Sequence, residues 1–305
     1  MIFYYCPDAF HFPSGGTRQL YRHVDILNAH GIDAAVLHDK PGFRLTWFRN
    51  DTQTEYIPET TATPEDIVVL PEGFAHGLPN IFPGLRKVIF NQNCFYTFTN
   101  YPLGYTGIFH YESAMAVLTA SAEGARYLAY AFPRARIYST CYGIDPALFH
   151  YDPIAQRHQI ALMPRKNAED VKQVLGMLRA RGHECPVVPI HDASFEDAAR
   201  VLRESSIFLS FGHPEGFGLP PLEAMACGCT VTGYHGVGGK EFFHEPYAFP
   251  IEFGDIVAYV QTVERILLGD LTIDPLVAAA FVRDTYPPER EAALLLEAWA
   301  GILAL

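Results

Sequence analysis

The chain has 305 residues, 49% of them hydrophobic and 18% charged, which is typical of a globular protein of about two domains. Acidic residues outnumber basic ones by 34 to 22, and the net charge of −12 disfavours nucleic acids and strongly anionic lipids as partners. We expect no transmembrane segment, because no apolar run reaches about 18 residues. The six cysteines contain no C-x-x-C pair, so we expect reduced thiols in a cytoplasmic protein, with peripheral attachment to the inner membrane face left open.

Apolar strands alternate with amphipathic helices in the first half of the chain, which predicts a parallel sheet. Residues 1–6 form the first strand, a helix runs from about 17 to 30, and 32–37 forms the next strand. Gly15 and Gly16 lie before the helix without the G-x-G-x-x-G spacing of a dinucleotide site. Spacing alone allows two interpretations of these glycines, a close approach to phosphate or sugar and a tight turn.

Polar residues follow two further strands, which we predict at 67–70 and 87–90. Glu72 follows the first, and Asn91–Asn93 follows the second. Ligands bind beyond the carboxyl ends of strands in open parallel sheets, so these residues are candidates for a ligand site, with ordinary capping as the alternative. The aromatic stretch 94–111 is interpreted mainly as core or domain contact, although rings of this kind also pack against sugars.

A second alternation of strands and helices begins after a polar linker at 150–156. A strand at 160–163 ends at Arg165 and Lys166, and a helix follows at 169–181. Later elements are predicted as strands at 186–190, 207–210 and 230–234 and as helices at 195–205, 255–268, 274–286 and 288–303. We therefore predict an α/β fold of two doubly wound, Rossmann-like domains facing each other across a cleft. The domain boundaries are set at 1–148 and 149–286, with 287–305 as a terminal helix that packs back toward the first domain.

The stretch from Phe211 to Gly228 reads F-G-H-P-E-G-F-G-L-P-P-L-E-A-M-A-C-G and predicts a glycine turn followed by a helix. Pro220 and Pro221 suit the first turn of that helix, where an N–H group would have no partner. The amides and dipole of such a helix start favour an anion. Because a carboxylate beside that anion costs electrostatic energy, we expect Glu215 to face a group rich in hydroxyls. Glu223 lies about one turn into the same helix.

Glu215 and Glu223, with G-F-G-L-P-P-L between them, resemble the Glu-x7-Glu motif of the retaining, nucleotide-sugar-dependent glycosyltransferases of family 4. The A-M-A-C-G-C-T-V stretch and residues 236–241, G-V-G-G-K-E, are similar to the same family. Residues 141–146 resemble its N-G-[VI]-D segment, with Tyr142 in place of the asparagine. The resemblance implies a GT-B fold and the transfer of a sugar, with retained configuration, from a nucleotide diphosphate sugar to a hydroxyl acceptor in glycan or polysaccharide synthesis.

The resemblance also implies roles for individual residues. Glu215 would contact the hydroxyls of the donor sugar near the reacting carbon, and Glu223 would bind the ribose hydroxyls. The other substrate-binding residues that it implies are Gly15, Gly16, Gly216, Phe217, Gly218 and Leu219. The second domain would bind the donor, and the first domain would select the acceptor.

Arg165 and Lys166 are the candidates for stabilising the leaving diphosphate, since both are cationic and arginine binds phosphate bidentately. A solvated turn is the ordinary interpretation of such a pair. Their position matches the basic pair of family 4, although the family separates its arginine and lysine by several residues. Lys172 in the following helix is a weaker substitute for the lysine.

We expect no metal and no cofactor. The sequence has neither Asp-x-Asp nor H-E-x-x-H, and the 13 histidines lack ligand spacing, with His213 more consistent with shaping the turn. The expected partners are therefore a nucleotide-sugar donor and a carbohydrate or other hydroxyl acceptor. Two other functions remain open. A sugar-nucleotide epimerase or a sugar phosphorylase has the same domain plan, and a phosphorylase would need a lysine for pyridoxal phosphate, for which Lys240 is a candidate by position only. The other function is a non-catalytic sugar-nucleotide-binding subunit.

Overall fold

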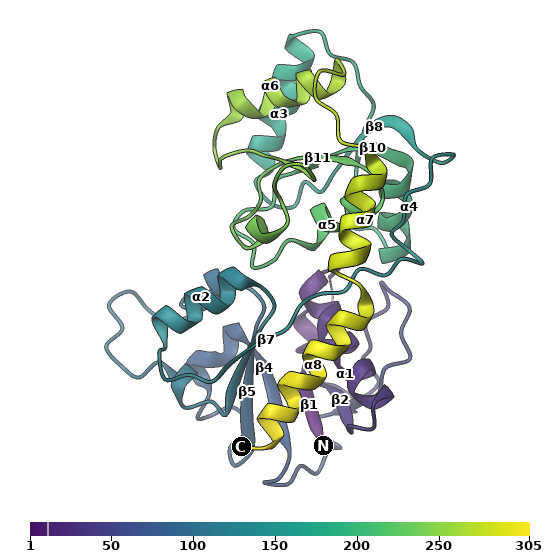
Figure 1. The fold of residues 1–305 in the computed structure, drawn as a ribbon. Coiled ribbons are helices and arrows are strands. Elements are labelled where there is room, and N and C mark those ends of the chain that lie inside the picture. The colour runs from purple at the N-terminus through teal and green to yellow at the C-terminus, as the bar shows by residue number, and fades with distance from the viewer. Residues whose placement is uncertain (11) are drawn as a thin grey trace. The chain divides into compact units, whose positions relative to one another are not determined.

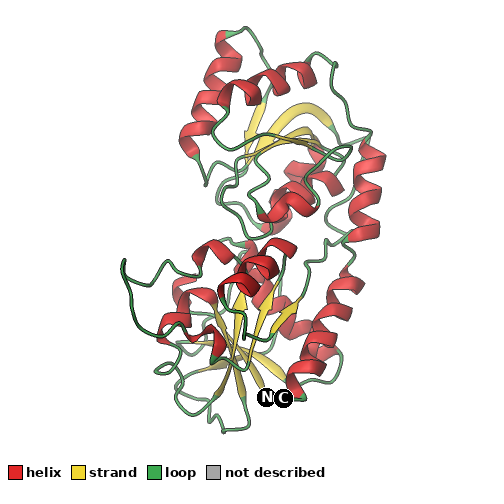
Figure 2. Ribbon diagram, turned by 60° about the vertical axis from the view of Figure 1, so that its left-hand side comes forward, coloured by secondary structure: helices red, strands yellow, loops and turns green. Residues whose placement is uncertain are grey.

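The computed structural model describes residues 1–10 and 12–305. The chain divides into two compact units, one formed by Met1–Cys141 with Glu291–Leu305 and the other by Tyr142–Arg290. Each unit contains one parallel sheet with helices packed on it, shown in yellow and red in Figure 2. The predicted class, α/β with two parallel-sheet domains, is thereby confirmed.

The first unit is built on a seven-stranded sheet in the order β3-β2-β1-β4-β5-β6-β7, and every neighbouring pair is parallel. Its strands are β1 (Ile2–Tyr5), β2 (Ala34–His38), β3 (Thr54–Tyr56), β4 (Ile67–Pro71), β5 (Arg86–Asn91), β6 (Ala116–Thr119) and β7 (Ile137–Ser139). Its α-helices are α1 (Gly15–Ala29), α2 (Ala122–Ala131) and α8 (Pro288–Leu303). Short 3-10 helices occupy Asp8–Phe10, Glu72–Gly77, Cys94–Tyr96 and His110–Glu112.

Alternate residues of the central strands face opposite sides of this sheet, as the two-residue period of a strand requires. Phe3, Val68 and Ile89 share one hydrophobic core with Leu128 of α2. Tyr4 lies on the other face, where its ring contacts Trp299 of α8 edge to face. Both faces of the sheet are therefore covered, which explains why every residue of β4 and β6 is buried.

The last helix returns to the first sheet, and α8 lies along β1 and α1 (Figure 1). The Trp299 side chain is fully buried, and its Nε1 donates a hydrogen bond of 3.0 Å to the Tyr4 hydroxyl. The Arg22 guanidinium of α1 pairs with the buried Glu291 carboxylate of α8. The C-terminal residues are thus part of the packing of the N-terminal sheet.

Replacing Trp299 with phenylalanine will destabilise the first unit by about 1–2 kcal/mol. The substitution keeps an aromatic ring in the core but removes the N–H donor to Tyr4 and leaves a small cavity. Chemical unfolding followed by circular dichroism measures the change. Leu303→Ala is the matched control, since Leu303 lies on the same helix with 47% of its surface exposed, and we expect it to stay within about 0.5 kcal/mol. Equal losses in both variants would contradict this account of α8.

The second unit is built on a five-stranded parallel sheet in the order β12-β11-β10-β8-β9. Its strands are β8 (Arg157–Leu162), β9 (Val187–Pro189), β10 (Ser205–Ser210), β11 (Thr230–Gly233) and β12 (Phe249–Pro250). Its helices are α3 (Ala168–Ala180), α4 (Phe195–Glu204), α5 (Leu219–Ala226), α6 (Ile256–Leu267) and α7 (Pro275–Thr285), with a 3-10 helix at Gly238–Glu241. The apolar sides of α3 and α6 pack on β8 and β10 to form its core.

The observed elements differ from the predicted ones at their ends and in two short edge strands, β3 and β12, which were not predicted. The helix predicted from residue 17 begins at Gly15, so both glycines lie in its first turn rather than in a preceding loop. The last helix has the predicted bounds, 288–303. In the described part of the chain, no helix combines the length and the apolarity needed to cross a bilayer.

Candidate functional site

A small pocket lies at the carboxyl ends of β8, β10 and β11 in the second unit, with room for about 70 Å³ of solvent. The loop between β10 and α5 forms one wall, and the turn after β8 contributes the basic residues. Of the sequence-predicted site residues, four line this pocket: Arg165, Lys166, Glu215 and Gly218. Ligands of open parallel sheets bind at this end of the strands, so the pocket is the candidate site of the second unit.

Glu215 is held at the pocket through its backbone. Its N–H donates to the Gly236 carbonyl at 2.8 Å, and its own carbonyl accepts from Gly238 N–H at 3.1 Å. A Cβ on Gly238 would lie 2.1 Å from the Gly216 carbonyl oxygen, so only glycine allows this close approach. The glycines of the G-V-G-G segment therefore fix the position of the Glu215 loop.

Lys166 links the basic turn to the same loop. Its Nζ lies 2.9 Å from Glu215 Oε1 and donates a hydrogen bond of 2.7 Å to the Pro214 carbonyl. Both side chains of the ion pair are partly exposed at the pocket. The lysine charge offsets the carboxylate that lies near the start of α5, which resolves the electrostatic conflict expected from the sequence. Arg165 is exposed beside it and provides a second cation.

Asn167 positions this loop as well, although it was not predicted as a site residue. It has the left-handed backbone conformation, with φ of 51°, directly before α3. Its Nδ2 donates to the carbonyls of Phe211 and His213 at 2.7 and 3.0 Å. Asparagine is one of the few residues that adopt this conformation readily, and this preference is the only local signal that Asn167 carries.

The turns after β10 and β11 place Tyr234 and His235 in the pocket lining and His213 next to it in sequence. The His213 ring stacks on Phe253 with 4.0 Å between the ring centroids, and the Tyr234 hydroxyl donates to Asp170 at 2.8 Å. Burial and the nearby Lys166 charge lower the pKa of His213, and burial together with Lys240 lowers the pKa of His235. Both imidazoles are consequently neutral at pH 7, so they add no charge to the site.

The remaining predicted residues of the second unit lie away from the pocket lining. Phe217 is buried, with its ring 5.1 Å from Tyr142 and 5.3 Å from Phe242. Glu223 is buried on α5 and does not line the pocket with Glu215. Lys172 pairs with Glu169 on the surface of α3, so it is not an alternative to Lys166. Three further predicted positions lie outside the pocket lining: Gly216 in the buried turn, Leu219 at the start of α5, and Lys240 as an exposed residue of the 3-10 helix Gly238–Glu241.

A second cluster lies at the carboxyl ends of β4 and β5 in the first unit. The Glu72 carboxylate accepts the N–H groups of Gln92 and Asn93 at 3.3 and 3.1 Å. Gln92 Nε2 donates to the Gly16 carbonyl at 3.0 Å, and a Cβ on Gly16 would lie 3.2 Å from Gln92 Oε1. The structure thus brings together Gly16, Glu72 and residues 92–93, which were predicted from the sequence as separate candidates.

Burial raises the pKa of Glu72 to about 7 against an ordinary value of 4.5, although backbone N–H donors, its own and those of Gln92 and Asn93, oppose the shift. The native state then binds more protons than the unfolded chain between about pH 4.5 and 7, so the stability contributed at this site falls as the pH rises through that window.

The side chain of Glu72→Gln cannot titrate. We therefore expect the free energy of unfolding of this variant, relative to that of the parent, to rise by roughly 2–3 kcal/mol between pH 5 and pH 8. Urea unfolding of both proteins at the two pH values measures this difference. Glu59→Gln changes an exposed carboxylate of the same unit and serves as the control, for which the pH dependence should match the parent. A pH-independent difference for Glu72→Gln would contradict the raised pKa.

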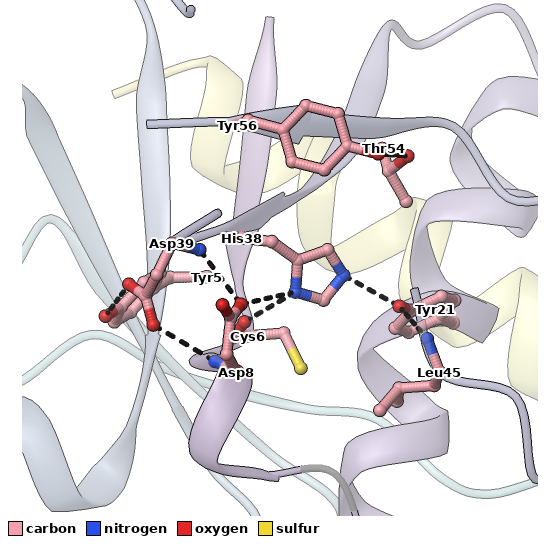
Figure 3. A network of polar contacts seen from close by, with 9 residues as sticks. All are labelled: Tyr5, Cys6, Asp8, Tyr21, His38, Asp39, Leu45, Thr54 and Tyr56. Atoms are coloured by element: carbon pink, nitrogen blue, oxygen red, sulfur yellow. Dashed lines mark hydrogen bonds and ion pairs between the residues drawn. The ribbon is translucent and has the colours of Figure 1, made fainter. Parts of the chain in front are cut away.

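A polar network joins the carboxyl ends of β1 and β2 (Figure 3). Asp8 and Asp39 cap each other, since each backbone N–H donates to the other carboxylate, at 3.0 and 3.2 Å. The buried His38 ring lies 2.7 Å from the Tyr21 hydroxyl through Nε2 and 2.7 Å from the Cys6 carbonyl through Nδ1. Burial lowers the pKa of His38, so the ring is neutral. The network fixes Cys6 and Asp8 directly after β1, and only the pairing of β1 with β2 reveals it.

Comparisons with known proteins place this fold among glycosyltransferases. No protein-family profile matches the chain. An alpha-1,6-glucosyltransferase of Actinobacillus pleuropneumoniae is 29% identical over 237 residues, which cover 73% of this chain and 69% of that protein. The crystal structure of Anabaena Alr3699/HepE with UDP and glucose superimposes with a TM-score of 0.73 at 13% identity, covering 98% of this chain and 99% of that one.

Two further solved structures have a similar fold. Sucrose-phosphate synthase from Thermosynechococcus elongatus gives a TM-score of 0.71 at 15% identity over 99% of both chains. A glycosyltransferase from Rickettsia africae gives 0.69 at 15% identity over 99% of this chain and 98% of that one. The two parallel-sheet units therefore have the fold of the GT-B glycosyltransferases.

Proposed function

We propose that the protein is a retaining glycosyltransferase of family 4, which moves a hexosyl or deoxyhexosyl group from a nucleotide diphosphate sugar to a hydroxyl acceptor without a metal ion. The observation that carries this proposal is the pocket at the start of α5, where Glu215 of the Glu-x7-Glu motif meets Lys166 beside Arg165. The likeness to an alpha-1,6-glucosyltransferase and to a fold found with UDP and glucose supports the same activity.

The charges of the pocket suit a diphosphate leaving group. Arg165 and Lys166 place two cations at the carboxyl end of β8. Gly218, the N-cap of α5, and Leu219 contribute backbone amides, whereas Pro220 and Pro221 have none. As the bond to the sugar breaks, negative charge builds on the phosphate, and these fixed donors stabilise it. Two cations of this kind supply the charge that a metal ion would otherwise provide.

Glu215 provides an acceptor for the sugar. Its carboxylate is oriented by Lys166 and accepts hydrogen bonds from the sugar hydroxyls close to the reacting carbon. No protein nucleophile is assigned, because the leaving phosphate itself takes the proton of the attacking hydroxyl on the same face of the sugar. Retention of configuration follows from that geometry. The carboxyl-end cluster of the first unit, with Gly16 and Glu72, serves the acceptor.

The test starts from UDP-glucose, with UDP-N-acetylglucosamine, GDP-mannose and ADP-glucose as competing donors and a panel of oligosaccharides as acceptors. We expect release of the nucleotide diphosphate and a new α-linkage in the proton NMR spectrum, unchanged by EDTA. A β-linked product would overturn retention, and loss of activity with EDTA would overturn metal independence. A requirement for inorganic phosphate would assign a phosphorylase, and a thermal shift with UDP-glucose but no turnover would assign a binding subunit.

A further inference from the structure

An uncharged aromatic loop follows β5 in the first unit. Between Cys94 and Phe109 the sequence contains no aspartate, glutamate, lysine or arginine, in a chain with 34 acidic and 22 basic residues. We call residues 94–109 the neutral loop. Figure 1 shows this segment looping out beside α2.

The base of the neutral loop is a packed array of rings rather than a loose coil. Phe98 lies 5.3 Å from Phe109 and 5.7 Å from Phe132, measured between ring centroids. Tyr101 lies 5.0 Å from Tyr105 and 4.8 Å from Phe109 in the same way. Aromatic pairs at these distances attract each other, so the base holds the rest of the loop in place.

The outer part of the neutral loop presents aliphatic side chains to the surroundings. Leu103, between Pro102 and Gly104, is fully exposed, and Ile108, after Gly107, is 70% exposed. Exposed apolar residues that gather on one element mark a contact surface, whereas single ones elsewhere are ordinary. The tyrosines of the loop carry hydroxyls on apolar rings, the amphipathic type that collects at the boundary between lipid headgroups and acyl chains.

We propose that the neutral loop docks on a weakly charged lipid bilayer, with Leu103 and Ile108 inserted at the boundary between headgroups and acyl chains. A protruding aliphatic tip fits a fluid surface, which closes around it without a preformed groove. Insertion of an uncharged segment also avoids the cost of transferring a charge into the apolar layer. A glycan chain would instead stack on exposed ring faces and would gain nothing from Leu103 and Ile108.

The net charge of the chain determines which lipid composition favours binding. A net charge of −12 repels anionic lipid, so binding by the neutral loop depends on apolar contact and not on phosphate neutralisation. Two aliphatic side chains bury less apolar surface than one myristoyl chain, which binds with an association constant of about 10⁴ M⁻¹. We therefore expect weak, reversible attachment that becomes visible at millimolar lipid.

The test is flotation of the full chain with phosphatidylcholine vesicles at millimolar lipid. We expect the parent protein to float with the vesicles equally at low and high salt, and to float less when phosphatidylglycerol is added at low salt. The double variant L103E/I108E should lose about tenfold or more in partitioning. Ile154→Glu is the matched control, because Ile154 is an aliphatic residue of the second unit with 95% exposure, and it should float like the parent.

A parent protein that fails to float would overturn the proposal, as would equal losses in L103E/I108E and Ile154→Glu. A second arm separates the glycan alternative. Retention on a soluble polysaccharide that L103E/I108E abolishes, without vesicle binding by the parent, would assign the loop to carbohydrate instead. Melting temperatures of both variants equal to that of the parent show that the substitutions leave the fold intact. Transfer to a water-dissolved acceptor should be the same in all proteins, so this result is independent of the proposed function.

Discussion

Glu215→Gln will lower kcat for sugar transfer by about 10²- to 10³-fold, with the melting temperature nearly unchanged. The glutamine keeps the shape of the side chain but removes the charge that faces Lys166 Nζ at 2.9 Å. The sugar then loses its carboxylate acceptor, and Lys166 loses the partner that orients it. Initial rates over a range of donor concentrations measure kcat and KM, and we expect the loss mainly in kcat because the charge develops in the transition state.

Glu169→Gln is the control for this variant. Glu169 also pairs with a lysine, Lys172, but on the exposed surface of α3 rather than at the pocket. Such exposed pairs contribute little to stability, so the control should keep both the activity and the melting temperature of the parent. Full activity of Glu215→Gln would remove Glu215 from the reaction, and equal loss in both variants would point to a general effect of charge.

Gly238→Ala will destabilise the second unit by about 3 kcal/mol or more and will abolish transfer. The new methyl group would lie 2.1 Å from the Gly216 carbonyl oxygen and 2.7 Å from that of Glu215. Both contacts are to backbone, so no side chain can turn away, and the two segments must separate. The hydrogen bond from Gly238 N–H to the Glu215 carbonyl is then lost, and Glu215 moves from its place at the pocket.

Gly176→Ala is the matched control, for which we expect a gain in stability instead of a loss. Gly176 lies within α3, and a Cβ built there meets nothing within 4 Å. Alanine favours the helix and restricts the unfolded chain, so this variant should gain about 0.5–1 kcal/mol and keep full activity. Unfolding in urea, followed by circular dichroism, measures both variants. A Gly238→Ala protein as stable and active as the parent would contradict the close packing of the two segments.

Much of the fold was predictable because its signals are local. The alternation of apolar strands with amphipathic helices determined two parallel sheets, and the glycine and proline pattern placed the start of α5 at Leu219. The end of the last helix at Leu303 was predicted in the same way. The start of α1 was less well predicted, because glycine usually disfavours a helix but is tolerated in a first turn, where hydrogen bonds are incomplete.

The sequence by itself therefore determined most strands and helices and their order, the acidic charge and the position of the Glu-x7-Glu segment, since each depends on residues that are neighbours in the chain. The tertiary structure alone decided that Lys166 pairs with Glu215, that Asn167 and Gly238 hold the same loop, and that Trp299 reaches Tyr4. These contacts join segments that are far apart in sequence. Their formation depends on how the strands align in the sheet and on which side chains meet when the core packs. No local sequence pattern encodes either.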